Sequence, residues 1–217
     1  MADPKKVLAQ FQKPEGWLGR LNVWDMNRRH SKLTDWGLKH VSIGDHDVVL
    51  DVGCGGGRTV CKLAAIAGSG KVYGIDYSMA SAEVSRQTNR EWIASGRVEI
   101  LRGSVSHLPF PDEMIDLSTA VETHYYWPDL GGDMHELLRV LKPGGTLIII
   151  AEAYKGGKHD KRFQRYEELL KQTNLRFLSV DEHREIFRTA GYADIQVDED
   201  YERGWICAFG RKPAADG

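Results

Sequence analysis

The chain has 217 residues, of which 41% are hydrophobic and 28% are charged, and its formal net charge at pH 7 is −2. A chain of this length and composition can bury one sizeable core, so we expect one domain with small additions. The nearly balanced charge supplies no overall field that would attract a phosphate backbone, which argues against nucleic acid as the principal partner.

The cysteines and the apolar runs indicate the compartment. Cys54, Cys61 and Cys207 are odd in number and show no Cys-x-x-Cys spacing, so the sequence predicts neither a disulfide framework nor a metal site. The first residues lack the apolar segment of a signal peptide, and the apolar run at 147–151 is far too short to cross a bilayer. We therefore expect a cytoplasmic protein without a membrane partner.

An N-terminal helical segment, residues 1–44, is expected to precede the core, because apolar residues recur there at helical spacing. Two interpretations remain open. The segment either folds over the pocket as an active-site lid, with Trp17, Asn27 and His30 contacting the substrate, or packs on the sheet edge as an ordinary amphipathic helix. Residues 45–217 form the expected core.

Strand-like apolar runs alternate with helical patterns along the core, which is typical of an α/β fold with a doubly wound, mostly parallel sheet. The unbroken β-branched run at 146–150 follows a Lys-Pro-Gly-Gly turn and predicts a strand covered on both faces. The other expected strands end near residues 51, 76, 102 and 122, and helices are expected at 58–67, 79–94 and 132–141.

The sequence predicts an insertion at about 154–178, with a helix at 158–172, after the fifth strand. Ser179 and Glu182 then have the spacing of a capping box and open a further helix, which Gly191 ends. Two last strands, close enough for an antiparallel hairpin, are expected at 192–197 and 205–210.

The most informative stretch lies at the end of the first strand, where Asp51 is followed by Gly53, Gly55 and Gly57. Alternating glycines before a helix let backbone N–H groups approach a polar ligand without obstruction by Cβ atoms. A pyrophosphate would be repelled by the carboxylate, whereas an ammonium group would be held by it. A dinucleotide loop also needs a third glycine where Arg58 stands. The loop therefore predicts a nucleoside ligand with a cationic tail.

A second acidic residue supports this interpretation. Asp76 ends the next strand, 19 residues beyond Gly57, where its carboxylate can accept hydrogen bonds from both ribose hydroxyls. Tyr77 follows with an aromatic face for the nucleobase.

These features, together with Leu108-Pro109-Phe110 and Val140-Leu141-Lys142-Pro143-Gly144-Gly145, resemble the motifs of class I S-adenosylmethionine-dependent methyltransferases in order and spacing. The resemblance covers about residues 45–152 and is greatest to the small-molecule branch that includes the quinone-biosynthesis C-methyltransferases. It implies a Rossmann-like sheet of seven strands with the last one antiparallel. It also implies S-adenosylmethionine as cofactor and S-adenosylhomocysteine as product.

The resemblance also assigns the residues that bind this cofactor. In one position the chain departs from the pattern, because many relatives have an aspartate after the third strand where this chain has Ser104, whose hydroxyl is a weaker acceptor for the adenine amino group. The expected cofactor-binding residues are Asp51, Gly53, Cys54, Gly55, Gly57, Asp76, Tyr77, Ser104, Val105 and Glu122.

The methyl acceptor is expected at the ends of the fourth and fifth strands, since ligands of open parallel sheets lie beyond the carboxyl ends of the strands. His124 and Glu152 are the candidate proton acceptors, and Tyr125 and Tyr126 are candidate substrate contacts. Aromatic residues after a strand also fill cores, and a lone histidine is often a packed residue. We expect a small-molecule acceptor and a monomer or a homodimer.

Two other functions remain as alternatives. One is a catalytically silent S-adenosylmethionine-binding partner that regulates another protein, because the motifs report cofactor binding rather than chemistry. The other is a nucleotide-dependent oxidoreductase, which Asp51 and the missing third glycine disfavour. The segment after the fourth strand also lacks the Asn/Asp-Pro-Pro-aromatic run of enzymes that methylate DNA amino groups.

Overall fold

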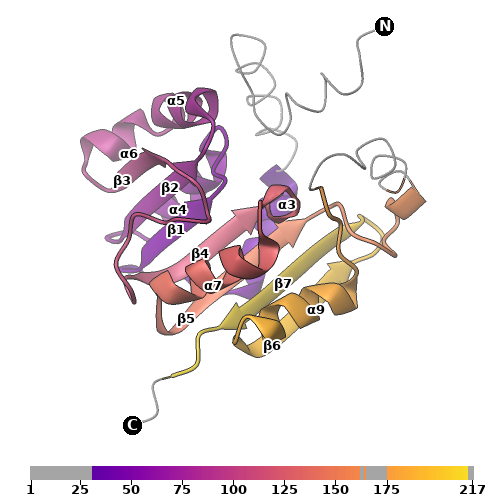
Figure 1. Ribbon diagram of the computed structural model, residues 1–217. Coiled ribbons are helices and arrows are strands. Elements are labelled where there is room, and N and C mark those ends of the chain that lie inside the picture. Colours follow the sequence, from indigo (N-terminus) through magenta and orange to yellow (C-terminus); the bar gives the residue numbers. More distant parts are fainter. Residues whose placement is uncertain (1–30, 162–163, 165–174, 215–217) are drawn as a thin grey trace, which may run out of the picture.

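The computed structural model describes residues 31–161, 164 and 175–214. Within these residues a seven-stranded sheet has the order β3-β2-β1-β4-β5-β7-β6 (Figure 1). The strands are β1 (Val48–Val52), β2 (Lys71–Asp76), β3 (Val98–Arg102), β4 (Ile115–Val121), β5 (Leu141–Ala151), β6 (Ala193–Asp200) and β7 (Trp205–Arg211).

All strand pairs from β3 to β5 are parallel, whereas β7 is antiparallel to both β5 and β6. The fold class predicted from the sequence is therefore confirmed, including the antiparallel last strand. The strand order reverses between β1 and β4, and in open α/β sheets this switch point is where the crevice for a ligand opens.

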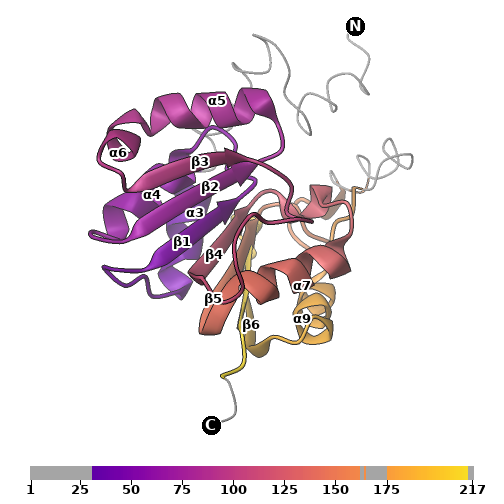
Figure 2. The same cartoon turned by 60° about the vertical axis from the view of Figure 1, so that its left-hand side comes forward.

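Helices cover both faces of the sheet, and Figure 2 shows α7 and α9 side by side. Apolar residues of α3, α4 and α5 form one core cluster with the sheet, and those of α7 and α9 form another. The helices are α3 (Ser31–Gly37), α4 (Arg58–Ile66), α5 (Met79–Thr88), α6 (Arg90–Ala94), α7 (Leu130–Val140) and α9 (Val180–Thr189), with short 3-10 turns η1 (Leu38–His40) and η2 (His124–Tyr126).

The central strand β5 packs against the helices on both faces of the sheet. Leu147 and Ile149 belong to the cluster under α7 and α9, whereas Ile148 and Ile150 belong to the one under α3 and α4. None of the four is exposed to solvent, as expected for a strand covered on both faces. α3 approaches so closely that a Cβ on Gly37 would overlap the Ile150 side chain.

Two elements differ from the sequence-based expectation. The helix expected at 79–94 is divided into α5 and α6 at Asn89, whose side chain donates 2.9 Å hydrogen bonds to the carbonyl oxygens of Ser85 and Gly57. The expected turn before residue 146 lies within β5 as a bulge, where the pairing with β4 changes register.

The start and the end of α9 are as predicted from the local sequence. Ser179 and Glu182 form the predicted capping box of α9, and Gly191 follows the helix with φ of 89°. The helix expected at 158–172 falls largely outside the described residues. None of the helices within the described ranges has the length and apolar character that a membrane crossing requires.

Candidate functional site

The glycine loop joins β1 to α4 and is tied to the neighbouring strand. The N–H groups of Gly53 and Cys54 both donate to the Ile75 carbonyl oxygen, at 2.8 and 3.0 Å. Gly53, Gly55 and Gly57 have φ angles of 70°, 50° and 78°, in the left-handed region that favours glycine. The backbone of the loop therefore requires glycine at all three positions.

The space around the three glycines differs. A Cβ on Gly53 would overlap the hydroxyl of Thr123, and one on Gly57 would overlap Ser85 and Asn89. A Cβ on Gly55 would meet no atom closer than the Gly53 carbonyl oxygen at 4.0 Å. Two glycines thus serve close packing, whereas Gly55 leaves room on the side of the loop where a ligand would lie.

Asp51 is buried beneath this loop, with 2% of its surface exposed. Its Oδ1 accepts a 2.7 Å hydrogen bond from the Thr119 hydroxyl on the neighbouring strand β4. Burial raises the pKa of the carboxyl to about 7, the Thr119 hydrogen bond opposes the rise, and the charge of Asp76 adds to it. A cation placed here would lower the pKa of Asp51 and stabilise its ionised form, so the site suits an ammonium group.

Asp76 ends β2 and connects two segments. Its Oδ2 accepts a hydrogen bond from Gly55 N at 2.9 Å, and its Oδ1 accepts one from Ser78 N at 2.8 Å. Burial raises its pKa, and these two backbone donors oppose the rise. A carboxylate has about four acceptor positions, so two remain for hydroxyl groups of a ligand.

The residues predicted to surround a nucleobase have different exposure. Tyr77 is exposed to 43% of its surface, and Val105 to only 7%. Ser104 is half-buried, and its hydroxyl oxygen accepts a 3.2 Å hydrogen bond from Ser106 N. A hydroxyl oxygen thus stands at the place where the family resemblance leads us to expect a carboxylate.

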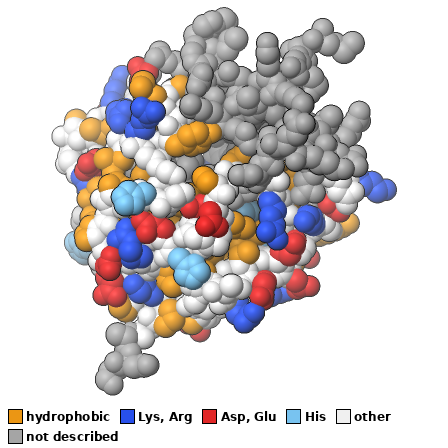
Figure 3. Space-filling model, viewed as in Figure 1, with side chains coloured by type: hydrophobic (Ala, Val, Ile, Leu, Met, Phe, Trp, Pro, Cys, Tyr) orange, Lys and Arg blue, Asp and Glu red, His pale blue; other side chains and the backbone are white. Residues whose placement is uncertain are grey.

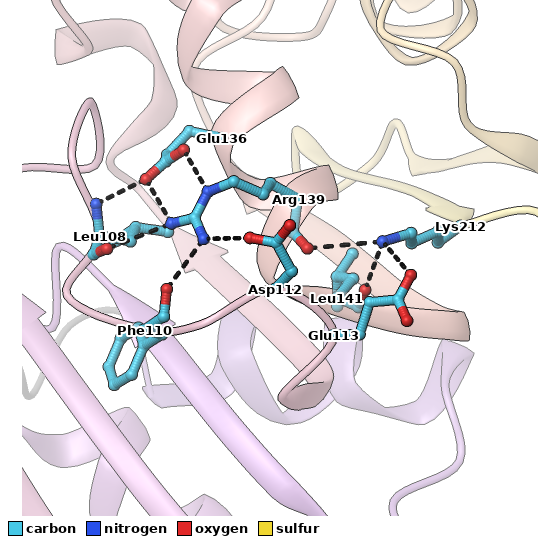
Figure 4. Close-up of polar contacts among 8 residues, drawn as sticks. All are labelled: Leu108, Phe110, Asp112, Glu113, Glu136, Arg139, Leu141 and Lys212. Atoms are coloured by element: carbon cyan, nitrogen blue, oxygen red, sulfur yellow. Dashed lines mark hydrogen bonds and ion pairs between the residues drawn. The ribbon is translucent and has the colours of Figure 1, made fainter.

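The segment that follows β3 and carries Ser104 is anchored on α7 (Figure 4). Arg139 makes two 2.8 Å hydrogen bonds to Glu136 and donates to the carbonyl oxygens of Leu108 and Phe110, at 3.2 and 2.9 Å. It also pairs with Asp112 at 2.8 Å, and Leu108 N donates to Glu136 at 2.8 Å. Lys212, from beyond β7, donates to the Leu141 carbonyl oxygen at 2.9 Å on the other side of this cluster.

The ends of β4 and β5 bring three of the predicted site residues together. Glu122 accepts 2.5 Å hydrogen bonds from the Tyr125 hydroxyl and from Glu152 N. Its φ is 58°, a strained value for a residue other than glycine. Burial and then the charge of Glu122 raise the Tyr125 pKa, so that phenol stays a donor at neutral pH. Tyr126 lies within electrostatic range of Glu122 and Tyr77, and burial raises its pKa too.

His124 is buried, with 1% of its surface exposed. Its Nε2 lies 3.2 Å from His183 Nε2, and His183 Nδ1 lies 2.8 Å from the Ser179 carbonyl oxygen. Because a carbonyl only accepts, His183 Nδ1 carries hydrogen, and His124 Nε2 must donate to the bare His183 Nε2. His124 Nδ1 is left as a buried acceptor without a hydrogen-bond partner among the described residues. Burial lowers the pKa of both rings, that of His183 to about 4.

The other predicted residues divide as follows. Cys54 is buried, and its thiol lies 3.7 Å from the Ser85 hydroxyl, in a packing position within the loop. Trp17, Asn27 and His30 lie outside the described residues. In the part of the chain that the structure describes, no three His, Cys, Asp or Glu side chains are grouped as metal ligands would be.

Four contributors were missed in the sequence: Thr119, Thr123, Asn89 and His183. Thr119 and Thr123 lie on and after β4, and they become neighbours of Asp51 and Gly53 only through strand pairing. His183 is 59 residues from His124 along the chain. The one usable signal was the strand order that the family resemblance implies, which places β4 beside β1.

Comparison with known proteins agrees with this geometry. A family model described as a methyltransferase domain matches residues 50–149. The demethylmenaquinone methyltransferase of Geobacillus sp. (strain WCH70) is 30% identical over 214 residues, which cover 89% of this chain and 91% of that protein. The enzyme of the same name from Geobacillus kaustophilus is 28% identical, with the same coverage of 89% and 91%.

Solved structures have the same fold. A chain from the complex between the Haloferax volcanii Trm112 methyltransferase activator and the putative methyltransferase matches with a TM-score of 0.78 and 24% identity, covering 91% of this chain and 96% of that one. A SAM-dependent methyltransferase from Aquifex aeolicus matches with a TM-score of 0.68 and 21% identity, covering 88% and 97%. With relatives of this similarity along nearly its whole length, the chain belongs to the class I S-adenosylmethionine-dependent methyltransferases, and it is an enzyme that uses S-adenosylmethionine as its cofactor.

Proposed function

We propose that the enzyme transfers the methyl group of S-adenosylmethionine to a small-molecule acceptor that binds at the carboxyl ends of β4 and β5. The observation that carries the proposal is the pair of buried carboxylates beside the glycine loop: Asp51 lies in β1 directly before the loop, and Asp76 ends β2 and accepts a hydrogen bond from Gly55 N. Two buried acids need donors or a cation, and a ligand with an ammonium group and ribose hydroxyls supplies both.

The residues of the cofactor site fit this ligand in separate roles. Asp51 holds the ammonium group, and Asp76 accepts from the ribose hydroxyls beside its bonds to Gly55 and Ser78. The glycine loop, including Cys54, lets the backbone approach. The remaining cofactor contacts are Tyr77, Ser104 and Val105 around the adenine and Glu122 near the methionine portion.

When bound, the cofactor supplies an electrophilic methyl group on a sulfonium, and methyl transfer is an in-line displacement. The protein contributes alignment of the acceptor, which can supply ~7–11 kcal/mol of the barrier in favourable cases. Glu122 fixes Tyr125 and the backbone of Glu152 at the acceptor end. Tyr125 and Tyr126 contact the acceptor, while His124 or Glu152 accepts its proton or orients it.

Other features of the chain complete the proposal. The N-terminal segment, residues 1–44, carries a lid over a core formed by residues 45–217, although its part in α3 packs against the sheet. The insertion at about 154–178 forms another wall of the acceptor site. The acceptor is not a nucleic acid. In support, Lys and Arg side chains lie among Asp and Glu on the face in Figure 3, without one basic patch, and the formal net charge is −2. We propose a cytoplasmic monomer or homodimer.

The test combines binding with product formation. Calorimetry should show that the protein binds S-adenosylhomocysteine, and more tightly than NAD. Labelled S-adenosylmethionine should then be incubated with a panel of small acceptors, including demethylated quinones because two relatives bear the name demethylmenaquinone methyltransferase. A product heavier by one methyl group supports the proposal. Cofactor binding without any product across the panel would favour the silent regulatory partner instead.

A further inference from the structure

The residues that lead into α9, and α9 itself, contact η2, the 3-10 turn that carries His124 and Tyr125. The ring of Phe177 meets that of Tyr125 edge-on, with 5.5 Å between the ring centroids. Arg176 N donates to the Tyr125 carbonyl oxygen at 3.2 Å. The third contact joins His183 of α9 to His124, with 3.2 Å between their Nε2 atoms. The start of α9 therefore supports a turn that carries two residues assigned to the acceptor site.

The backbone at the start of α9 sets the hydrogen position on His183. The Ser179 carbonyl oxygen lies 2.8 Å from His183 Nδ1 and also accepts from His183 N at 2.9 Å. Ser179 is held in turn by the capping box, in which its hydroxyl accepts from Glu182 N at 3.2 Å and its N–H donates to Glu182 at 2.8 Å. A carbonyl can only accept, so His183 Nδ1 carries the hydrogen. The bare Nε2 of His183 thus presents an acceptor to His124.

His124 can meet this acceptor in only one way. A neutral imidazole carries its single hydrogen on either nitrogen, and the two forms offer opposite nitrogens as acceptors. Burial lowers the pKa of both rings, that of His183 to about 4, so both are neutral near pH 7. The bond to His183 Nε2 requires the hydrogen of His124 on Nε2. His124 Nδ1 then remains a buried acceptor, without a hydrogen-bond partner among the described residues.

We infer that His183 is a positioning residue of the acceptor site, which holds His124 in the one tautomer whose Nδ1 can take up a proton. The inference deepens the proposed function and rests on the assignment of His124 to the methyl acceptor. The proton that the acceptor loses as it gains the methyl group passes to His124 Nδ1, while Nε2 keeps its own proton on His183. In the other tautomer Nδ1 would be a donor and could not serve as the base.

Nuclear magnetic resonance of protein labelled with ¹⁵N-histidine reads the tautomer directly and needs neither cofactor nor acceptor. In the parent protein, His124 Nε2 should carry a proton that exchanges slowly with water. A coupling across the hydrogen bond should join this nitrogen to His183 Nε2. The signals of His124 are assigned by their loss in His124→Gln. A proton found on His124 Nδ1, or on His183 Nε2, would overturn the inference.

Two substitutions of His183 separate positioning from packing. His183→Leu fills a similar volume but accepts no hydrogen bond, so the slowly exchanging proton should be lost and part of the protein should carry it on His124 Nδ1. His183→Gln restores an acceptor, because its amide nitrogen faces the Ser179 carbonyl oxygen and its amide oxygen faces His124. With a methyl acceptor in hand, turnover should fall by about tenfold or more in His183→Leu, since a histidine in the wrong tautomer is a poor base. His183→Gln should recover most of it.

His135→Leu is the matched control. His135 Nδ1 lies 2.8 Å from the carbonyl oxygen four residues earlier on α7, as in His183, but its side chain is exposed and is not bonded to His124. This variant should retain the parent's His124 signals and turnover. The affinity for S-adenosylhomocysteine should be the same in all the variants, because His183 is assigned to the acceptor end of the site.

Equal His124 signals and equal turnover in His183→Leu and His183→Gln would overturn the inference and leave the proposed function intact. The spectrum of the parent protein decides the direction of the hydrogen bond even where a variant does not fold. Failure of the proposed function has a different signature, since no methylated product would then form with any acceptor while the spectra of the ligand-free protein stay as described.

Discussion

The Thr119 hydroxyl donates a 2.7 Å hydrogen bond to Asp51 Oδ1, across a pair of residues that are directly opposite on β4 and β1. Burial raises the pKa of Asp51, this hydrogen bond opposes the rise, and the balance of the influences is a pKa of about 7. The carboxyl is thus poised to change its charge near neutral pH, at the point where the cofactor's ammonium group is proposed to bind.

The affinity for S-adenosylhomocysteine should therefore depend on pH. Below pH 7 Asp51 is protonated in the free protein, and binding an ammonium group must first remove that proton. The affinity should fall as pH drops below 7, by at most about tenfold per pH unit. Calorimetry between pH 5.5 and 8 measures this. The control ligand is 5′-methylthioadenosine, which lacks the amino acid tail and should not show this dependence. Equal slopes for both ligands would refute the role of Asp51.

The stability of the ligand-free protein should also depend on pH, because the pKa of Asp51 is raised in the folded state. A raised pKa means that the stability contribution of Asp51 is fully present below its ordinary pKa of 3.8 and is lost as pH rises through about 7. In Asp51→Asn this loss is absent. The variant should gain stability relative to the parent as pH rises, by up to roughly 4 kcal/mol. Urea unfolding at pH 4.5 and 8 measures the difference, and a difference independent of pH would contradict the burial argument.

The glycine loop and the two acidic residues of this site could be predicted from the sequence because they depend on local signals. Asp51 and the three glycines form one continuous stretch, and Asp76 ends the next strand. The capping box of α9 likewise lies within four consecutive residues. Each of these features follows from a few neighbours in the chain.

The rest depends on which strands and helices become neighbours. Thr119 reaches Asp51 only through parallel pairing with a register that no local pattern fixes. His183 on α9 meets His124 on η2 across 59 residues of sequence, and the capping box that predicts α9 does not predict this neighbour. The pairing of strands and the packing of helices, rather than local motifs, therefore determine which side chains become partners in this site.

The glycine loop allows a direct comparison of adjacent residues. Gly55→Val should weaken S-adenosylhomocysteine binding by more than about tenfold, because a branched side chain is strained at φ of 50° and occupies the open side of the loop. Cys54→Ala should retain binding and lose roughly 1 kcal/mol of stability, since Cys54 only packs. Calorimetry on both variants, with circular dichroism to verify folding, is the measurement. Equal affinities would show that the proposed loop geometry is wrong.

Arg139 should matter more for stability than an ordinary surface arginine. Arg139→Ala leaves Leu108 and Phe110 without their side-chain donor and Glu136 without its partner, so we expect a loss of roughly 1–3 kcal/mol. Arg188→Ala is the control, because Arg188 also pairs with a glutamate three residues earlier but on an exposed surface. Its replacement should leave the stability nearly unchanged. Amide hydrogen exchange at Leu108 should accelerate only in the Arg139 variant.

The buried histidine pair gives the last prediction. Both rings have lowered pKa values, that of His183 about 4. The stability that their neutral forms contribute is present above the ordinary pKa of 6.5 and is lost as pH falls toward 4. His124→Gln retains an N–H donor for His183 but has no imidazole. Once an acceptor is known, this variant should leave the affinity for S-adenosylhomocysteine nearly unchanged.

Turnover in His124→Gln should fall by about 10²-fold or more if His124 Nδ1 accepts the proton of the acceptor, which is the usual contribution of a positioned base. His183→Gln separates this role from packing. It keeps the contact between η2 and α9 and the imidazole of His124, so turnover should be affected far less than in His124→Gln. The pH profile of the parent's turnover should show no loss at pH 6 from protonation of this ring, because burial holds its pKa well below 6.5. Full turnover in His124→Gln would remove His124 from the mechanism and leave Glu152 as the proton acceptor.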